Sequence, residues 1–298
     1  MSSRRFLPMN HKWRLNKRSF DGTIEKRSAP KKLSGNDVLL QLRLLKKVKF
    51  GKTMKKKKSD YDLNSLNWRK CSIFLKLPYW KNNLLRHNLD VMHIEKNICD
   101  NIIGTLLDIE GKTKDGLNAR CDLKEMGIRK ELHPIMKDGK WVYLAACYTL
   151  SKVEKQKVLK FLKSLKLSDG YSSNIARCVN LKDGKVFGFK SHDYHILLEQ
   201  LLPLAIRGIV PSNVYDAITE FSILFRELCS KVLKKEVLER LESDIPIILC
   251  KLEKIFNPAF FDVMVHLAIH LPAEAKLGGP VQYRWMYPIE RFLRVLKC

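Results

Sequence analysis

The sequence predicts a mainly helical protein with small β-hairpins and a C-terminal antiparallel helical bundle. Three observations favour this fold class. After Ser191, apolar residues recur at steps of three and four positions, which keeps them on one face of a helix. Two Asp-Gly pairs, at Asp138 and Asp183, lie between short runs of strand-forming residues, as tight hairpins require. Hydrophobic residues make up 45% of the 298 positions, enough for a sizeable core in one large or two ordinary domains.

Residues 1–68 are expected to form a basic, largely irregular arm. Residues 1–58 carry 19 lysines and arginines against three acidic residues, so this stretch supplies +16 of the total net charge of +25. One short helix is expected inside the arm, capped by Asn36 or Asp37. Its apolar positions are Val38, Leu39, Leu42, Leu45 and Val48. A charge excess of this size favours DNA or RNA as the partner.

Two groups of basic residues in the arm are candidate DNA contacts. The first group lies beside Trp13 and Phe20, and such a mixture can stack on bases while it neutralises phosphates. Its members are Arg14, Lys17 and Arg18. The second group is a lysine run made of Lys55, Lys56, Lys57 and Lys58. The alternatives are that the aromatic residues dock onto the folded part of the chain and that the lysine run is a solvated linker or a nuclear-targeting signal.

Residues 69–190 are expected to combine a strand, several helices and the two hairpins. Residues 71–77 alternate as a strand does and end at Pro78. The helix that follows carries Asp90 and His93, which are three positions apart and therefore share one face. One interpretation makes these two residues a hydrogen-bonded pair on a buried helix. The other places them in a motif beside an active site.

Two further helices are predicted in the same region. A short one spans Asp115 to Met126 and ends at Gly127. The next begins with a capping box formed by Ser151 and Glu154. Its outer positions are filled by Lys152, Lys155, Lys157, Lys160, Lys163 and Lys166. This lysine face is either a surface for phosphates or an ordinary solvated face.

Residues 191–298 are expected to be helical throughout and to form the bundle. The helix boundaries are expected at four prolines, because proline lacks a backbone donor and clashes with the preceding turn. These are Pro203, Pro211, Pro246 and Pro258. The helix from Ile196 to Arg207 is expected to kink or split at the first proline, and a later helix to yield near the third. Asn257 is expected to cap the helix that the fourth begins.

The histidines and cysteines predict no metal site. The eight cysteines include no C-x-x-C pair, so a zinc ribbon is not expected and the thiols are taken to be reduced. His266 and His270 have the spacing by which a helix offers two nitrogens to a metal, but Leu267 stands where metalloproteases have glutamate. A role at the edge of the core is therefore favoured for them. For His192 and His195 only local hydrogen bonding is expected.

The segment RHNLDVMHIEKNICDNIIGTLLDIEGKTKD resembles transposases of plant CACTA (En/Spm-like) elements, in which Asp-x-x-His is a signature. Other segments resemble the same transposases and the domain of unknown function that follows them. These are RFLPMNHKWRLNKRSFDG, MGIRKELHPI, DGYSSNIARCVN and HLAIHLPAEAKLGGPVQYRWMYPIERFLRVLK. The resemblance implies a partial ribonuclease-H-like transposase core at residues 69–190. It also implies a transposase-associated helical domain at residues 191–298.

Transposases of this kind are expected to hold two Mg²⁺ ions with three carboxylates, which stabilise the attacking and leaving oxygens together. The resemblance implies Glu290 as the third acid, Asp90 and His93 as the signature, and Arg284 and Arg291 as residues that steady phosphates. In the family pattern the first two acids precede the signature. The sequence is therefore expected to be the C-terminal part of a transposase, with an incomplete catalytic set and no cofactor of its own.

Three functions remain open at this point. The favoured one is a transposon-derived protein that binds DNA non-specifically and lacks a full catalytic set. The alternatives are an active metal-dependent transposase, if upstream exons supply the missing acids, and a helical module that binds itself or an intact transposase. A nuclear location is expected. A membrane is not expected as a partner, because no stretch reaches about 18 uninterrupted apolar residues.

Overall fold

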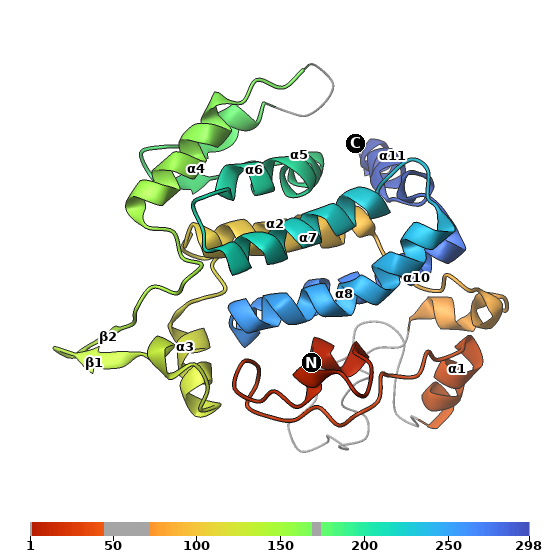
Figure 1. The fold of residues 1–298 in the computed structure, drawn as a ribbon. Coiled ribbons are helices and arrows are strands. Elements are labelled where there is room, and N and C mark those ends of the chain that lie inside the picture. Colours follow the sequence, from red (N-terminus) through yellow and green to blue (C-terminus); the bar gives the residue numbers. More distant parts are fainter. Residues whose placement is uncertain (1, 45–71, 169–173, 298) are drawn as a thin grey trace. The chain divides into compact units, whose positions relative to one another are not determined.

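The computed structural model describes residues 2–44, 72–168 and 174–297 (Figure 1). It is mainly helical with two small antiparallel hairpins, as the sequence predicts. The chain divides into two compact units, of which one consists of Met1–Ala29 and Leu89–Cys298 and the other of Pro30–Asn88.

In the unit Pro30–Asn88, helix α1 spans Gly35–Leu44. Reciprocal hydrogen bonds hold its start. The Ser34 hydroxyl accepts from the Asp37 N–H at 3.1 Å, and the Asp37 carboxylate accepts from the Ser34 N–H at 2.7 Å. Ser34 rather than Asn36 or Asp37 therefore caps the helix. The predicted helix positions Leu45 and Val48 and the run from Lys55 to Lys58 lie outside the described residues.

The strand expected at residues 71–77 is instead the 3-10 helix Ile73–Lys76, so this prediction is wrong. The Ser72 hydroxyl accepts a hydrogen bond from the Phe74 N–H, which folds the chain into a turn. Ile73 and Phe74 are 71% and 64% exposed. Since strand preference depends on packing against a neighbouring strand and on burial, the alternation alone does not produce a strand.

Helix α2 (Val91–Leu106) forms much of the core of the other unit. It packs against α5 (Ser191–Ile196) and α9 (Val263–Leu267). Its apolar residues Met92, Ile94, Ile103 and Leu106 are buried, and Ile98 and Ile102 have no exposed surface. Burying an aliphatic side chain of this size stabilises the fold by about 1.5–3 kcal/mol, so α2 is a main source of packing energy.

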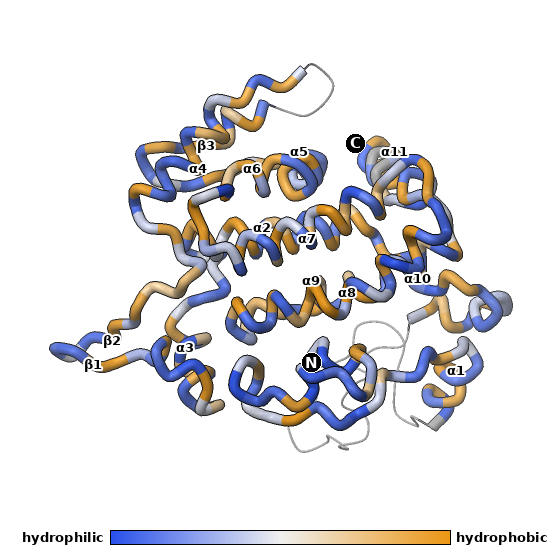
Figure 2. Tube along the Cα trace, in the orientation of Figure 1, coloured by the Kyte–Doolittle hydropathy of each residue, from blue (hydrophilic) through white to orange (hydrophobic). Residues whose placement is uncertain are grey.

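Helices α7 (Ser212–Leu228) and α8 (Lys235–Ile255) pack along each other (Figure 1). Hydrophobic and hydrophilic residues alternate along both helices in Figure 2, as expected for helices with one buried face. α8 continues through Pro246, so the interruption predicted there is wrong. Pro246 is itself buried, between Ile245 and Ile248, which are buried as well. Packing on both sides of the proline therefore outweighs the lost backbone hydrogen bond.

The segment from Ile196 to Ile206 is helical without a break at Pro203, so the split predicted there is wrong; the change from α-helical to π-helical geometry lies before the proline. A π-helical turn, Leu197–Leu201, follows α5 and leads into α6 (Leu202–Ile206). Pro203 then lies near the start of α6, directly after the π-helical turn. A π-turn inserted between α-helical turns frequently marks a functional position.

The single helix predicted after Asn257 is wrong. Asn257 precedes the short 3-10 helix Pro258–Phe260 without a capping hydrogen bond from its side chain. The Asp262 carboxylate then caps α9, because it accepts from the N–H groups of Met264 and Val265. α9 is followed by the 3-10 helix Ala268–His270, α10 (Leu271–Gly278), the 3-10 helix Val281–Tyr283 and α11 (Tyr287–Lys297).

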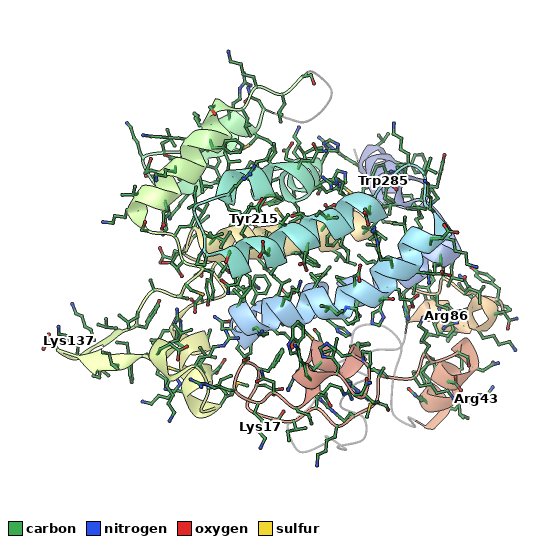
Figure 3. The ribbon with its side chains drawn as sticks, viewed as in Figure 1. Lys17, Arg43, Arg86, Lys137, Tyr215 and Trp285 are labelled. Atoms are coloured by element: carbon green, nitrogen blue, oxygen red, sulfur yellow. The ribbon has the colours of Figure 1, made fainter. Side chains whose placement is uncertain are left out.

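Both hairpins form where the Asp-Gly pairs predict them. β1 (Ile135–Lys137) and β2 (Lys140–Val142) are joined by Asp138 and Gly139, which both have positive φ angles. Figure 3 shows Lys137 near the outer end of this hairpin. β3 (Val179–Asn180) and β4 (Lys185–Val186) form the second hairpin. Within the described residues, these two-stranded sheets contain all the strands.

The two helices predicted between residues 115 and 166 are also present. α3 spans Leu117–Glu125 and is followed by Gly127 with a positive φ angle. α4 spans Lys152–Ser164 and begins with the predicted capping box. In this box the Ser151 N–H donates to the Glu154 carboxylate at 2.8 Å, and the Glu154 N–H donates to the Ser151 hydroxyl.

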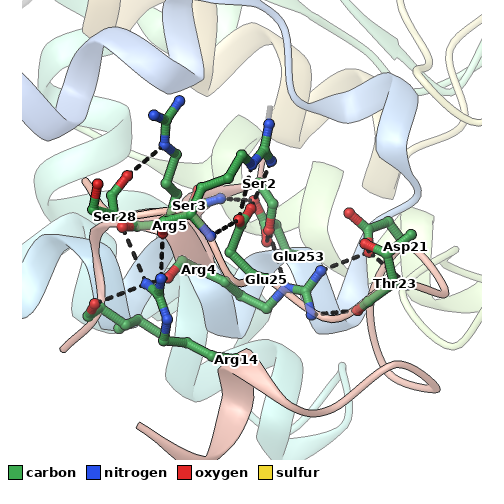
Figure 4. Close-up of polar contacts among 12 residues, drawn as sticks. Ser2, Ser3, Arg4, Arg5, Arg14, Asp21, Thr23, Glu25, Ser28 and Glu253 are labelled. Atoms are coloured by element: carbon green, nitrogen blue, oxygen red, sulfur yellow. Dashed lines mark hydrogen bonds and ion pairs between the residues drawn. The ribbon is translucent and has the colours of Figure 1, made fainter. Parts of the chain in front are cut away.

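Residues 2–29 fold onto α8 instead of forming an unanchored arm (Figure 4). The Ser3 N–H donates to the Glu253 carboxylate of α8 at 2.6 Å. The Arg4 side chain is fully buried and pairs with the Asp21 carboxylate at 2.6 Å. An apolar patch completes the contact, formed by Leu7, Phe20 and Cys250 with Trp13 and Ile247 at its edge. The aromatic residues of this segment therefore dock onto the protein.

Within the described residues, no helix is long and apolar enough to cross a membrane.

Candidate functional site

Asp90 is the N-cap of α2. Its carboxylate accepts hydrogen bonds from the backbone N–H groups of Met92 and His93 at 3.2 and 3.3 Å. The side chain of His93 is exposed. The two residues are therefore linked through the backbone of His93, and the expected pairing of the carboxylate with the imidazole ring is not observed. This geometry gives Asp90 a structural task that accounts for an acid at this position.

Replacing Asp90 with alanine should lower the free energy of unfolding by about 1 kcal/mol, because two N–H groups at the start of α2 lose their acceptor. Asp90→Asn should cost much less, since an amide oxygen caps a helix nearly as well. Urea denaturation measures both. The exposed His93→Ala serves as the control and should stay within about 0.5 kcal/mol. Equal losses in the alanine and asparagine variants would contradict capping as the role of Asp90.

The predicted third acid, Glu290, is exposed in the first turn of α11. Among the described residues, no hydrogen bond or ion pair connects its carboxylate to Asp90 or His93. A different acid joins the two motifs, and sequence reasoning missed it. Glu274 in α10 accepts from the Leu89 N–H at 2.9 Å and pairs with Arg284 at 3.5 Å. Arg284 is thus engaged inside the protein rather than presented to a phosphate.

Arg14, Lys17 and Arg18 differ in their availability. Arg14 is 2% exposed, and its guanidinium donates to the backbone carbonyls of Arg4, Leu7 and Arg27 (Figure 4). The guanidinium of Arg14 is therefore enclosed and occupied by carbonyl groups of its own segment. Lys17 and Arg18 are exposed. Arg291 lies in α11.

The lysine face predicted on α4 is present. Its exposed members are Lys152, Lys157, Lys160 and Lys163. Lys166, which follows the helix, is exposed as well. The Lys163 ammonium donates to the Ala176 carbonyl at 2.8 Å. α4 is held to the unit by its buried Val158, Leu159 and Leu162. The lysine side chains therefore lie on the exposed part of the helix surface.

A second group of residues, which the sequence did not reveal, gathers four potential metal ligands. We call it the four-ligand cluster, and it consists of Glu95, His195, Glu199 and Cys229. Glu95 comes from α2, His195 from α5, and Glu199 from the π-helical turn. Cys229 directly follows α7. One potential ligand atom from each residue lies within 4.8 Å of those of the other three.

The four-ligand cluster is enclosed. Glu95 has no exposed surface, Glu199 and Cys229 are 7% and 8% exposed, and the His195 side chain is 16% exposed. Nδ1 of His195 lies 2.8 Å from the nearer Glu95 carboxylate oxygen and 3.2 Å from that of Glu199. A single ring nitrogen therefore faces two buried carboxylates.

Burial dominates the electrostatics of the four-ligand cluster. It raises the pKa of Glu95 well above the usual range. Burial, followed by the charge of Glu95, raises the pKa of Glu199 to about 7. Burial likewise raises the pKa of the Cys229 thiol and lowers the pKa of His195, although the Glu199 carboxylate opposes the latter effect. Burial thus disfavours the charged form of every member.

The segment before α11 contacts the backbone of the four-ligand cluster. Nε2 of Gln282 donates to the Cys229 carbonyl at 2.7 Å. The positive charges of Arg226 and Arg284 act on the cluster, since they lower the pKa values of Glu199 and Cys229 respectively. Only the i,i+4 spacing of His195 and Glu199 could have been noticed in the sequence. Glu95 lies a hundred positions from His195, so its participation depends on the fold.

The comparisons with known proteins match both ends of the chain. Residues 1–45 match the transposase family tnp2, and residues 228–298 match a domain of unknown function, DUF4218. Together the two matches support a transposase-family protein. No curated protein and no solved structure matches the chain. The second match begins at the end of α7 and includes Cys229 and Gln282, while Glu95, His195 and Glu199 lie outside both matches.

Proposed function

We propose that this chain is a transposon-derived transposase that binds DNA through exposed basic residues, with little dependence on DNA sequence. The observation that carries the proposal is the pair of family matches, to a transposase at one end and to DUF4218 at the other. The net charge of +25 supports DNA as the partner, because cations on a protein release the counterions condensed on DNA. The proposal includes the CACTA (En/Spm-like) lineage and a nuclear location.

The described surface offers two places for phosphate contact. The lysine face of α4 presents cations from a regular helix that its buried side holds in place. Lys17 and Arg18 add two exposed cations in the N-terminal segment. Figure 3 shows Lys17 at the outer edge of this segment. No base-reading element is needed for this kind of binding, so the proposal is limited to contact with the DNA backbone.

DNA affinity should fall steeply with salt. Fluorescence anisotropy with a labelled duplex should give a linear decrease of log K with log salt, with a slope of about −0.9 for each phosphate neutralised. The double variant Lys157→Gln, Lys160→Gln should bind more weakly at every salt concentration and reduce the slope by about 1 to 2. Lys231→Gln, Lys235→Gln removes the same charge from exposed sites near the start of α8 and is the matched control.

Two outcomes would overturn DNA binding by α4. One is affinity that does not change with salt. The other is an equal loss in the α4 variant and in the matched control, because the net charge alone would then explain the effect.

DNA cutting is not part of this proposal. The Asp90 carboxylate is engaged as a helix cap, and no hydrogen bond or ion pair between described residues joins Glu290 to Asp90 or His93. Incubation with Mg²⁺ or Mn²⁺ and a labelled duplex is therefore expected to leave the DNA intact. Strand cleavage that Glu290→Gln abolishes would instead favour an active transposase.

A helical interaction module receives less support than DNA binding. That hypothesis depends on the apolar helix faces between Val214 and Ile255, and Val214, Ile218 and Phe221 on these faces are fully buried within the chain. α7 and α8 use these faces to pack on each other and on their neighbours. These buried residues are therefore engaged within the chain, which is why this hypothesis has less support.

A further inference from the structure

The four-ligand cluster is short of hydrogen-bond donors. Glu95 Oε1 is buried and has no hydrogen-bond partner among the described residues. Nδ1 of His195, which carries at most one hydrogen, bonds the other Glu95 oxygen, while Glu199 Oε1 lies 3.2 Å from the same nitrogen without a hydrogen bond among the described residues. The Glu199 carboxylate has a side-chain hydrogen bond with Cys229, a weak thiol donor. Buried carboxylates are normally paired or bound to a metal, since an unpaired one is costly. The site therefore lacks a positive partner for its oxygens.

The donor set also selects the kind of cation that would suit it. Imidazole nitrogen, thiolate sulfur and carboxylate oxygen are the three ligand types that zinc takes in proteins. Mg²⁺ prefers oxygen ligands in octahedral geometry and usually keeps several waters, which an enclosed site with sulfur and nitrogen does not provide. The cluster is thus chemically distinct from a two-Mg²⁺ centre built from carboxylates.

The geometry requires only small side-chain shifts. Tetrahedral zinc with bonds of about 2.0–2.3 Å holds its ligand atoms roughly 3.5 Å apart. The cluster atoms already lie within 4.8 Å of one another. His195 and Glu199 are separated by one turn, and the π-helical turn that contains Glu199 follows directly after α5.

We propose that Glu95, His195, Glu199 and Cys229 bind one Zn²⁺ ion as a closed structural site. The ion gives the buried carboxylates their cation and holds the Cys229 sulfur as thiolate. With three anionic ligands the bound site keeps one negative charge, which the nearby charges of Arg226 and Arg284 offset. The ion ties α2 to the α5 segment and to the end of α7, where Gln282 holds the Cys229 carbonyl.

Metal analysis of the full chain tests this proposal. Mass spectrometry of protein purified without chelator should find one zinc ion per chain. Removing zinc should lower the Tm by about 10 °C, and adding Zn²⁺ should restore it while the same concentration of Mg²⁺ should not. Replacement by Co²⁺ should produce a thiolate-to-cobalt charge-transfer band and the visible bands of a tetrahedral ion.

Variants separate this site from zinc bound elsewhere. Cys229→Ser and His195→Ala should lose the bound zinc, and Cys229→Ser should also lose the charge-transfer band. Cys250→Ala removes another buried thiol, from α8 and outside the cluster, and should keep both the zinc and the charge-transfer band. The Co²⁺ spectrum of the unmodified chain answers the question even if a variant fails to fold. Zinc-free protein whose Tm does not respond to added Zn²⁺, or zinc that persists in Cys229→Ser, would overturn the proposal.

Discussion

Replacing Asp115 with alanine is expected to lower the free energy of unfolding by about 3–5 kcal/mol. Asp115 and Arg120 form a two-pronged ion pair with distances of 2.5 and 2.6 Å, and both side chains are nearly inaccessible. The same carboxylate accepts from Nδ2 of Asn257 at 2.9 Å. Without Asp115 the guanidinium of Arg120 is left as a buried charge that has lost its carboxylate partner. Urea denaturation followed by circular dichroism measures the loss.

Two variants control this prediction. Asp122→Ala removes an exposed carboxylate from α3 and should change stability by no more than about 0.5 kcal/mol. Arg120→Met in the Asp115→Ala background should recover much of the loss, because it removes the uncompensated charge. A loss in Asp115→Ala no larger than that in Asp122→Ala would show that the pair contributes little.

Replacing Arg14 with alanine is expected to weaken the attachment of residues 2–29 by about 3 kcal/mol. The buried carbonyl groups of Arg4 and Leu7 and the partly buried carbonyl of Arg27 lose the donor that Arg14 supplies. Each buried polar group left unmatched costs about 1–3 kcal/mol before the segment relaxes. Hydrogen exchange should detect the change in the Glu25 N–H, which donates to the Arg14 carbonyl at 2.9 Å. Its protection should fall by about 100-fold, while that of the α2 core amides should change much less.

Arg18→Ala is the matched control, because Arg18 is exposed in the same segment. It should leave amide protection unchanged and weaken DNA binding. The main effect of Arg14→Ala should instead be the loss of amide protection. Arg14→Lys should be intermediate, since an ammonium group cannot reproduce the planar arrangement of guanidinium donors. Unchanged protection of Glu25 in Arg14→Ala would contradict an anchoring role.

The sequence alone predicted the elements whose signals are local. The capping box of Ser151 and Glu154 sets the start of α4, and the Asp138-Gly139 pair sets the first hairpin. The apolar spacing of α7 placed Val214, Ile218 and Phe221 on the face that is buried. These signals depend on backbone angles and on neighbours within four residues, so the chain expresses them regardless of what packs nearby.

Other outcomes depend on residues that are far apart in the chain. The local chemistry of Pro246 should end a helix. α8 nevertheless continues past this proline, because the residues on either side of it are buried in the core. Residues 71–77 alternate like a strand, but a strand forms only with a partner and burial. Arg14 lies among basic and aromatic residues in the sequence, which is why it was predicted to contact DNA. Only the folding of residues 2–29 onto α8 shows that it is enclosed.

The four-ligand cluster depends most on the tertiary structure. The sequence showed His195 beside ordinary polar neighbours, and nothing local connects it to Glu95 or Cys229. The fold brings them together because α2 packs against α5 and the π-helical turn, while α7 ends beside that turn. The sequence by itself therefore determined the helices, the hairpins and the excess of positive charge, since these follow from short-range spacing and composition. Only long-range packing decided which polar groups are enclosed together, because burial and the pairing of charges arise between distant segments.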